Sequence, residues 1–296
     1  MSSKALTLII LQYNGVSLTK NLLDSIVKYE KEYLPEYEII LADNGSTEGD
    51  GFGSFKADYP FVTLVKNEEN YGFAKGVNRI AATVTTPYLL LINNDIILTE
   101  DSIHIVLKQM IAINADAMTC AMTDGENSIM QNWSCKLSSA GIVFYIYTGF
   151  EKIWRAYVRR KSTPSRVYYI NGGFLMLRSA IFKKVGYFTE RFFMYTEDLE
   201  LMLKLNKIKA RMYYTPATGI IHLDGKSAET VWTTAEKEEL TLRQALEIYS
   251  EQSGKAIFAI HRFFWMLIEY LKYKRSKNMK HYYRYSFLAK NLSSKH

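Results

Sequence analysis

Residues 89–98 read LLLINNDIIL, and seven of these ten positions are leucine or isoleucine. Such a run is typical of a strand that is buried on both faces of a sheet. Asn93, Asn94 and Asp95 interrupt the run near its middle, although burying such groups without partners costs several kcal/mol. We therefore expect the strand to end at this triplet, on a polar edge of the sheet. Ile96 then begins the return of the chain into the fold.

Similar apolar runs occur on both sides of this stretch, and amphipathic segments separate them. Strands are expected at 5–13, 37–44, 61–67, 88–95 and 115–122, and helices at 17–31, at 71–84 and after Thr99. Ser17 and Thr99 are the expected N-caps of the first and third helices. This alternation predicts an α/β fold in which helices cover a mostly parallel sheet.

The second half of the chain is less regular. Loops are expected at 123–141 and 153–169, a strand with a short helix at 169–186, a helix at 196–210, a strand pair at 211–223 and helices from Glu236 onward. Arg159, Arg160 and Arg166 would allow the segment 153–169 to close over phosphates, although a solvated basic loop explains it equally well. We expect one domain over 1–225 and a helical extension over 226–296.

The formal net charge is +7 and is unevenly distributed. Residues 255–296 hold ten lysines and arginines against a single acidic residue, Glu269, so this tail carries +9 and the rest −2. The asymmetry indicates an anionic partner for the tail, either membrane or nucleic acid. Cys120 and Cys135 make no disulfide framework or metal cluster, and the N-terminus shows no signal-peptide pattern, so a cytoplasmic protein is expected.

The tail also contains an apolar, aromatic stretch at 256–271. This stretch is shorter than the ~20 apolar residues of a spanning helix, and His261, Arg262 and Glu269 interrupt it. Placement at a membrane surface is favoured, with aromatic residues at headgroup depth and basic residues on anionic lipid. The alternative is a helical cap that packs on the catalytic domain or on the partner in a homodimer.

Polar residues end several of the expected strands. Asn14 follows the first strand, Asp43 and Asn44 end the second, the triplet 93–95 ends the fourth and His222 ends the last. Ligands of open parallel sheets bind at the carboxyl ends of the strands. A single ending of this kind is usually a turn or a cap. Four of them together predict a ligand site at one edge of the sheet.

Six segments of the chain carry a family resemblance. They are IILQYNG, ILADNGSTEG, NYGFAKGVNRI, LLLINNDIIL, INGGFLMLRSAIFKKVGYFTERFFMYTEDLELMLKL and IIHLDGKSA. In this order, between residues 6 and 228, they resemble glycosyltransferase family 2, and most closely its rhamnosyltransferase branch. The resemblance implies the nucleotide-sugar-binding GT-A fold, with a Rossmann-like, mostly parallel sheet, and inverting sugar transfer. The C-terminal helical extension lies beyond the resemblance.

The resemblance also implies how a nucleoside diphosphate sugar binds. Asp43 would accept a hydrogen bond from N3–H of uracil or thymine, since a carboxylate only accepts. Asp95 would bind Mn²⁺ or Mg²⁺, which neutralises charge on the diphosphate. Asn93 stands where the family has a first aspartate, so the metal is expected to arrive with the donor. The full set of expected donor-binding residues is Tyr13, Asn14, Asp43, Asn44, Gly72, Lys75, Asn78, Asn93, Asn94, Gly172 and Gly173.

Thr196, Glu197 and Asp198 begin the helix expected at 196–210. By the resemblance, Asp198 is the general base that takes a proton from the acceptor hydroxyl, while Glu197 orients the acceptor or a loop. Acidic residues in a first helical turn also have a plain explanation, because the helix dipole favours them and Thr196 is an ordinary N-cap. His222 is implied as a ligand of the metal or the diphosphate.

These expectations describe a glycosyltransferase at the inner face of the cell membrane, acting in the synthesis of cell-surface polysaccharide. The donor would be dTDP-rhamnose or a UDP-hexose, and the acceptor a hydroxyl of a glycan or a lipid-linked saccharide. A nucleotidyltransferase should carry a glycine-rich, basic loop after the first strand, where this chain has QYNGVSLTKN. A nucleic-acid-binding protein that uses the basic tail would leave Asp43, Asp95 and Asp198 unexplained. The intact Thr-Glu-Asp at 196–198 argues against an inactive glycan-binding relative.

Overall fold

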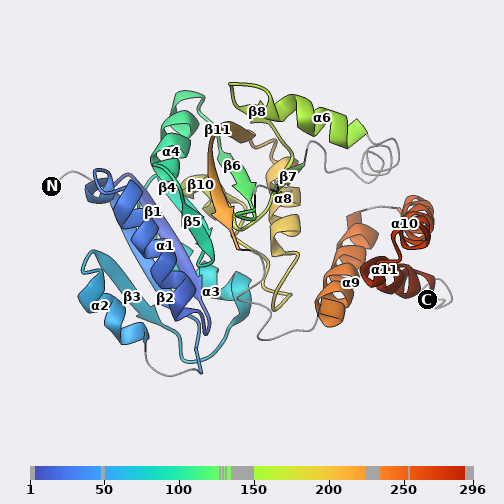
Figure 1. Cartoon of the computed structure of the whole chain (residues 1–296), viewed down its shortest axis with the longest axis horizontal. Coiled ribbons are helices and arrows are strands. Elements are labelled where there is room, and N and C mark those ends of the chain that lie inside the picture. Colours follow the sequence, from blue (N-terminus) through green and yellow to red (C-terminus); the bar gives the residue numbers. More distant parts are fainter. Residues whose placement is uncertain are drawn as a thin grey trace. The chain divides into compact units, whose positions relative to one another are not determined.

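The structure, a computed structural model, describes residues 4–47, 51–126, 128, 130, 132–134, 150–223, 234–252 and 254–290 (Figure 1). The chain divides into two compact units, which we describe separately. Unit 1 contains Met1–Cys135 and Arg155–Ser227, and unit 2 contains Lys136–Trp154 and Ala228–His296. Three parts of the sequence predictions lie outside the described residues: the boundary at 225, most of the loop at 123–141 and the end of the segment IIHLDGKSA.

A nine-stranded sheet forms the centre of unit 1, in the order β3-β2-β1-β4-β10-β6-β11-β5, with β8 paired to β11. Its strands are β1 (Leu6–Gln12), β2 (Tyr37–Asp43), β3 (Val62–Lys66), β4 (Tyr88–Asn93), β5 (Ile96–Leu98), β6 (Ala117–Thr123), β8 (Ser165–Arg166), β10 (Phe174–Arg178) and β11 (Met212–His222). A second, two-stranded sheet joins β7 (Trp133–Ser134) to β9 (Tyr169–Ile170). The α/β class and the five strands expected in the first half are confirmed.

Strand direction changes at β10. The strands β3, β2, β1 and β4 run parallel to one another. β10 lies between β4 and β6 and runs antiparallel to both, which makes the sheet mixed. As a result, the first residue of β10, Phe174, lies opposite Ile92 near the end of β4. The chain just before β10 therefore reaches the edge at which the parallel strands end.

Two predictions for the second half were wrong. The segment 211–223 is one strand, β11, because the turn-like sequence at Pro216 is an irregularity within it; pairing with β6 shifts register between Thr215 and Gly219. Proline has no backbone N–H for the ladder, so it is tolerated at such a bulge. The segment 153–169 is not a loop throughout, since it contains the end of helix α6 (Phe150–Arg159) and β8.

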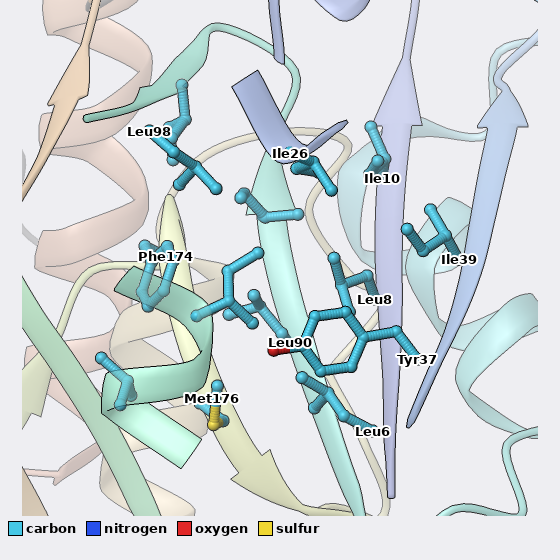
Figure 2. Close-up of a cluster of buried hydrophobic side chains, with 14 of the residues drawn as sticks. Leu6, Leu8, Ile10, Ile26, Tyr37, Ile39, Leu90, Leu98, Phe174 and Met176 are labelled. Atoms are coloured by element: carbon cyan, nitrogen blue, oxygen red, sulfur yellow. The ribbon is translucent and has the colours of Figure 1, made fainter. Parts of the chain in front are cut away.

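Helices cover both faces of the sheet. Leu6, Leu8 and Ile10 point from β1 to one face, where they join Ile26 of helix α1 (Val16–Tyr29) in a buried cluster (Figure 2). Side chains alternate along a strand, so Leu11 points to the other face. There it lies against helix α3 (Gly72–Ala81), where a Cβ on Gly76 would meet it at 3.0 Å. Remaining helices of unit 1 are α2 (Phe55–Asp58), α4 (Ser102–Ala112), α7 (Ser179–Lys184) and α8 (Glu197–Lys207).

The predicted N-caps of the first and third helices were wrong. Gly15 caps α1, and Asp101 occupies the N-cap position of α4. The buried carboxylate of Glu30 accepts hydrogen bonds from the α4 backbone instead, at 2.7 Å from Ile103 N. A carboxylate at a helix N-terminus offsets unpaired N–H groups and the helix dipole. This distant partner makes a hydroxyl cap on Thr99 unnecessary.

Gly72 holds α3 against the loop that precedes α8. Its φ is +75°, and a Cβ at this position would lie 2.1 Å from the carbonyl oxygen of Phe193. The same oxygen accepts a hydrogen bond from Phe73 N at 3.0 Å. Asn78, one and a half turns later, adds hydrogen bonds to the carbonyl of Phe188 at 3.0 Å and to Glu190 at 2.8 Å. The loop is therefore fixed on α3 from both ends.

The described C-terminal part of unit 2 is helical, as predicted, with α9 (Thr234–Gln252), α10 (Lys255–Ser276) and α11 (Met279–Lys290). α10 and α11 run antiparallel, since Arg262 donates to the Leu288 carbonyl at 3.1 Å while Glu269 lies 2.7 Å from His281. Among the helices in the described part of the chain, none is long and apolar enough to cross a membrane.

Substitution of Gly72 by alanine should destabilise unit 1 strongly. The change forces an L-residue into a left-handed conformation and places its Cβ on the Phe193 carbonyl, so we expect a loss of about 2–4 kcal/mol in the free energy of unfolding. Urea denaturation followed by circular dichroism measures it. Gly53→Ala is the matched control, because a Cβ there meets nothing within 4 Å. Equal stability of the two variants would contradict the role of Gly72 in holding α3 against the loop before α8.

Candidate active site

The register of the sheet brings the polar strand ends together. Gln12, at the end of β1, lies opposite Asp43 of β2, and Leu11 lies opposite Asn93 of β4. His222, which ends β11, lies opposite Ile96, the first residue after the Asn94-Asp95 turn. The strand endings predicted to converge therefore do lie along one edge.

Asp43 is buried and fixed by its neighbours. Its Oδ1 accepts a hydrogen bond from Gln12 Nε2 at 3.2 Å and another from the Ser46 hydroxyl. Asn14, in a left-handed conformation, joins this loop, since its backbone N–H donates to Ser46 at 2.9 Å and its side chain accepts from Thr47 N at 2.9 Å. The preceding Tyr13 is half-buried. The loop after β2 is thus tied to the end of β1.

Asn44 links the loop after β2 to the start of α3, whereas Lys75 of α3 lies against Tyr71. The buried Asn44 side chain accepts from Asn67 Nδ2 at 3.0 Å and donates to the Gly72 carbonyl at 3.1 Å. Lys75 is exposed, and its ammonium lies 4.3 Å from the centre of the Tyr71 ring. The polar groups of Asn44 and Asn78 point at neighbouring protein groups, so in this structure both residues shape the edge.

Asp95 and His222 form a close pair at the centre of the edge. Asp95 Oδ1 lies 3.1 Å from His222 Nε2, and both residues are buried. Apart from this contact, Asp95 Oδ1 and His222 Nδ1 have no hydrogen-bond partner within the described ranges. Asn94, by contrast, points back to α1, where its amide lies 3.1 Å from the Thr19 hydroxyl.

This pair fits a divalent cation. Adjacent ligands of an octahedral Mg²⁺, each about 2.1 Å from the metal, lie about 3 Å apart, as the carboxylate oxygen and imidazole nitrogen do here. Among the described residues there is no group of three His, Cys, Asp or Glu side chains able to hold a metal. Two protein ligands leave several positions to water and phosphate oxygens, which is the way proteins usually bind Mg²⁺.

Glu197 and Asp198 open helix α8 as two adjacent, half-buried carboxyl groups. Asp198 Oδ2 accepts a hydrogen bond from the Tyr169 hydroxyl at 2.6 Å, and Oδ1 lies 2.7 Å from Leu199 N. Removal from water raises the pKa of Asp198 above its usual range, against the effect of these hydrogen bonds and one from Gly172 N–H. Burial, with the adjacent Asp198 charge, raises the pKa of Glu197 to about 8.

The backbone in front of the carboxyl pair is unusual. Tyr195 and Thr196 have φ values of 68° and 63°, in the left-handed region that few non-glycine residues adopt. Thr196 occupies the N-cap position, as predicted, but with this conformation and not the extended one of an ordinary N-cap. Strained residues of this kind are found where surrounding contacts fix them, often at functional sites.

The turn 171–173 lies between two pairs of residues, Asp95 with His222 and Glu197 with Asp198. Gly173 donates to the Asn171 side chain at 2.8 Å, and its carbonyl accepts from Asn93 N at 2.9 Å. A Cβ on Gly173 would lie 3.5 Å from His222 and from the Asn93 amide, while a Cβ on Gly172 would lie 3.7 Å from Asp198. These are ordinary van der Waals distances, so the turn lies close to His222 on one side and to Asp198 on the other.

Sequence reasoning missed Tyr169, Gln12 and Asn171. Tyr169 stands directly before the INGG segment, in a run of aromatic residues that gave no reason to single it out. Gln12 precedes the predicted strand-end residues by one position and faces Asp43 only through the register of β1 and β2. Asn171 and Tyr169 owe their positions to the antiparallel entry of β10, which the sequence pattern did not predict.

Comparison with curated proteins gives distant relatives. An N-acetylglucosaminyl-diphospho-decaprenol L-rhamnosyltransferase of Mycobacterium tuberculosis is 27% identical over 204 residues, which is 62% of this chain and 66% of the relative. The rhamnosyltransferase WbbL of Escherichia coli K12 is 26% identical over 166 residues, 51% of this chain and 61% of that protein. The chain thus spans less than two thirds of the length of these relatives.

Solved structures show the same fold at low identity. The mannosyltransferase PcManGT of Pyrobaculum calidifontis, in complex with GDP-Man and Mn²⁺, matches 100% of this chain and 89% of its own, with a TM-score of 0.63 at 15% identity. TarS of S. aureus, in complex with UDP-GlcNAc, matches 86% of this chain and 69% of its own, with a TM-score of 0.58 at 16% identity. Both support the GT-A fold predicted from the sequence.

The model of the family described as "Glycosyl transferase family 2" matches residues 7–186. This match covers more than half of the chain and includes β1 through α7. The chain therefore belongs to glycosyl transferase family 2.

Proposed function

We propose that this protein is an inverting glycosyltransferase, which moves a sugar from a nucleoside diphosphate sugar to a hydroxyl group. The observation that carries the proposal is the position of the turn 171–173, which lies beside His222, the partner of Asp95, on one side and beside Asp198 on the other. A leaving diphosphate and an acceptor base are needed on opposite sides of one sugar in a direct displacement. The turn gives the donor sugar a place between them.

The donor half of the site is assigned to the edge formed by β1, β2 and β4. Asp43 is a buried acceptor held in place by Gln12 and the Ser46 hydroxyl, which suits the N3–H donor of a uracil or thymine ring. The rhamnosyltransferase relatives favour dTDP-rhamnose, and the UDP-GlcNAc complex of TarS favours a UDP-hexose. Either base presents the same imide to Asp43.

Asp95 and His222 are assigned to a divalent cation, Mn²⁺ or Mg²⁺. When bound, the cation would neutralise charge on the diphosphate of the leaving group. The Mn²⁺ in the PcManGT complex supports this assignment. Asn93 stands in place of the first aspartate of the family pattern, so phosphate oxygens are required to complete the ligand set.

Asp198 is assigned as the general base for the acceptor hydroxyl. Its raised pKa makes it a better proton acceptor than an ordinary aspartate, provided the pH is high enough to ionise it. Glu197 retains a proton near neutral pH because of its burial and the adjacent charge of Asp198. A neutral Glu197 can donate a hydrogen bond, which suits orientation of the acceptor.

The acceptor is proposed to be a glycan or lipid-linked saccharide of cell-surface polysaccharide synthesis, at the cytoplasmic face of the membrane. Support comes from the Mycobacterium tuberculosis relative, which is an N-acetylglucosaminyl-diphospho-decaprenol L-rhamnosyltransferase. The direct test is a hydrolysis and transfer screen of dTDP-rhamnose and several UDP-sugars, with and without Mn²⁺. Failure to bind or turn over any donor would exclude the proposal.

Asp198→Asn should abolish transfer and leave donor binding intact. The amide cannot accept the hydroxyl proton, and general base catalysis contributes about 10²- to 10⁴-fold, so kcat should fall by that factor. Donor affinity, measured by calorimetry, should stay within about twofold because Asp198 lies on the acceptor side. Asp58→Asn, which changes an exposed carboxylate of α2, is the control. Normal transfer by Asp198→Asn would refute the base assignment.

Tyr169→Phe should move the pH dependence of transfer. The Tyr169 hydroxyl stabilises the ionised form of Asp198, so its loss raises the pKa of the base further. The acidic limb of the kcat/KM profile should shift to higher pH by about one to two units, because a hydrogen bond to a charged group contributes about 1.5–3 kcal/mol. Tyr168→Phe, at the exposed neighbouring residue, should leave the profile unchanged. An unshifted Tyr169→Phe profile would show that this contact is not coupled to the base.

Asp95→Asn and His222→Asn should each raise the Mn²⁺ concentration needed for half-maximal donor hydrolysis, by about tenfold or more. Asp95→Asn removes the negative charge of the carboxylate ligand, and His222→Asn removes the imidazole nitrogen that lies 3.1 Å from it. His104→Asn is the control, since His104 stacks on Tyr33 at 3.6 Å, outside the site. A metal response equal to that of the unchanged protein would argue against the cation site.

A further inference from the structure

Helix α10 buries polar side chains and exposes apolar ones, which is the reverse of an ordinary surface helix. His261 and Glu269 are its two buried residues, with exposed fractions of 4% and 2%. Its large apolar side chains lie on the outside: exposed residues are Ile257, Ile260, Phe263, Phe264, Leu267 and Leu271. Charged groups are almost never fully buried unless paired, and contiguous exposed apolar patches mark interaction sites.

Glu269 and Arg262 are fixed by contacts with helix α11, while the His261 ring lies 5.5 Å from that of Tyr249 in α9. The Glu269 carboxylate lies 2.7 Å from His281 Nδ1, and Arg262 donates to the Leu288 carbonyl at 3.1 Å. The ring of Tyr270 also lies 5.2 Å from that of Tyr285. Rotating α10 to bury its apolar side would break these contacts, so the apolar side stays outward.

The exposed apolar residues form a continuous stripe. Ile257, Ile260, Phe264, Leu267 and Leu271 follow one another at alternating intervals of three and four residues, which places them on one face of the helix. We call these five residues the apolar stripe. The same spacing continues to Lys274 and Arg275, both exposed, which lie on this face one turn beyond Leu271. The stripe therefore ends in positive charge.

The charge of α10 and of the chain that follows it indicates what covers the stripe. Residues 255–296 carry ten basic side chains and one acidic side chain, and that acid, Glu269, is buried against α11. A second copy of the chain would bring the same positive charge to the same face. A surface of anionic lipid offers apolar chains to the stripe and negative headgroups to the lysines and arginines.

We propose that α10 lies in the interface of an anionic lipid bilayer. The apolar stripe enters the boundary between headgroups and acyl chains, and the basic segment 272–277 contacts the headgroups. α11 covers the opposite, polar side of α10. The helix lies parallel to the surface, in keeping with its being too weakly apolar for a span. This surface goes beyond the proposed sugar transfer, since it requires neither donor nor acceptor.

Flotation of the full-length protein with lipid vesicles tests this surface. We expect the protein to float with vesicles of equal parts phosphatidylcholine and phosphatidylglycerol, to stay behind with phosphatidylcholine alone, and to be released by salt. Failure to float with the anionic vesicles, or equal flotation with both compositions, would overturn the proposal. These measurements on the unchanged protein do not depend on the folding of any variant.

Two pairs of substitutions locate the surface. We expect each of two double variants to reduce vesicle binding by about tenfold or more. One combines Phe264→Ser with Leu267→Ser, and the other combines Lys274→Glu with Arg275→Glu. Matched controls are Ile111→Ser, at an apolar residue 50% exposed on α4, and Lys108→Glu with Lys207→Glu, at exposed lysines of unit 1. Vesicle binding by both test variants at the level of the controls would overturn the proposal.

Donor hydrolysis and light scattering distinguish a membrane surface from a dimer contact. Donor hydrolysis should be unchanged in the stripe variant, because hydrolysis takes place at the edge of the sheet in unit 1. Loss of vesicle binding with intact hydrolysis supports the membrane surface, whatever the outcome for sugar transfer. If light scattering shows that the unchanged protein is a dimer and the stripe variant a monomer with full vesicle binding, the stripe is a dimer contact and the proposal fails.

Discussion

The hydrogen bond from Asn93 N to the Gly173 carbonyl, at 2.9 Å, holds the two halves of the site together. It joins the end of a parallel strand, β4, to the start of an antiparallel one, β10. Because β10 runs in the opposite direction, its leading turn reaches the edge where the other strands end. Without this reversal, the carboxyl groups of Glu197 and Asp198 would have no fixed relation to Asp95 and His222.

The site concentrates features that oppose stability. Two half-buried carboxyl groups lie side by side, and two left-handed residues, Tyr195 and Thr196, precede them. Contacts further away offset these costs, chiefly the packing of Gly72 on Phe193 and the hydrogen bonds of Asn78. The same α3 helix is linked through Asn44 to the loop after β2. The proposed donor and acceptor regions are therefore stabilised by one shared element, which explains why residues expected to bind the donor have structural partners.

Periodicity predicted the first half of unit 1 well, because strands buried on both faces leave long apolar runs. It also predicted which strand ends carry polar groups, since Asp43 and the triplet 93–95 stand out in such runs. The reversal at β10, the bulge at Pro216 and the cap of α4 by Glu30 depend on contacts between residues far apart in the chain. Local sequence carries no signal for them, and Tyr169 was missed for the same reason.

Calorimetric titration of the unchanged protein with UDP and with dTDP, in the presence and absence of Mn²⁺, tests whether the cation and the diphosphate bind this site together. Asp95 and His222 supply only two ligand atoms, so cation and diphosphate should each complete the site of the other. We predict weak binding of Mn²⁺ alone and at least about a tenfold gain in nucleotide affinity when Mn²⁺ is present. Tight binding of Mn²⁺ without nucleotide, or equal nucleotide affinity in both conditions, would contradict it.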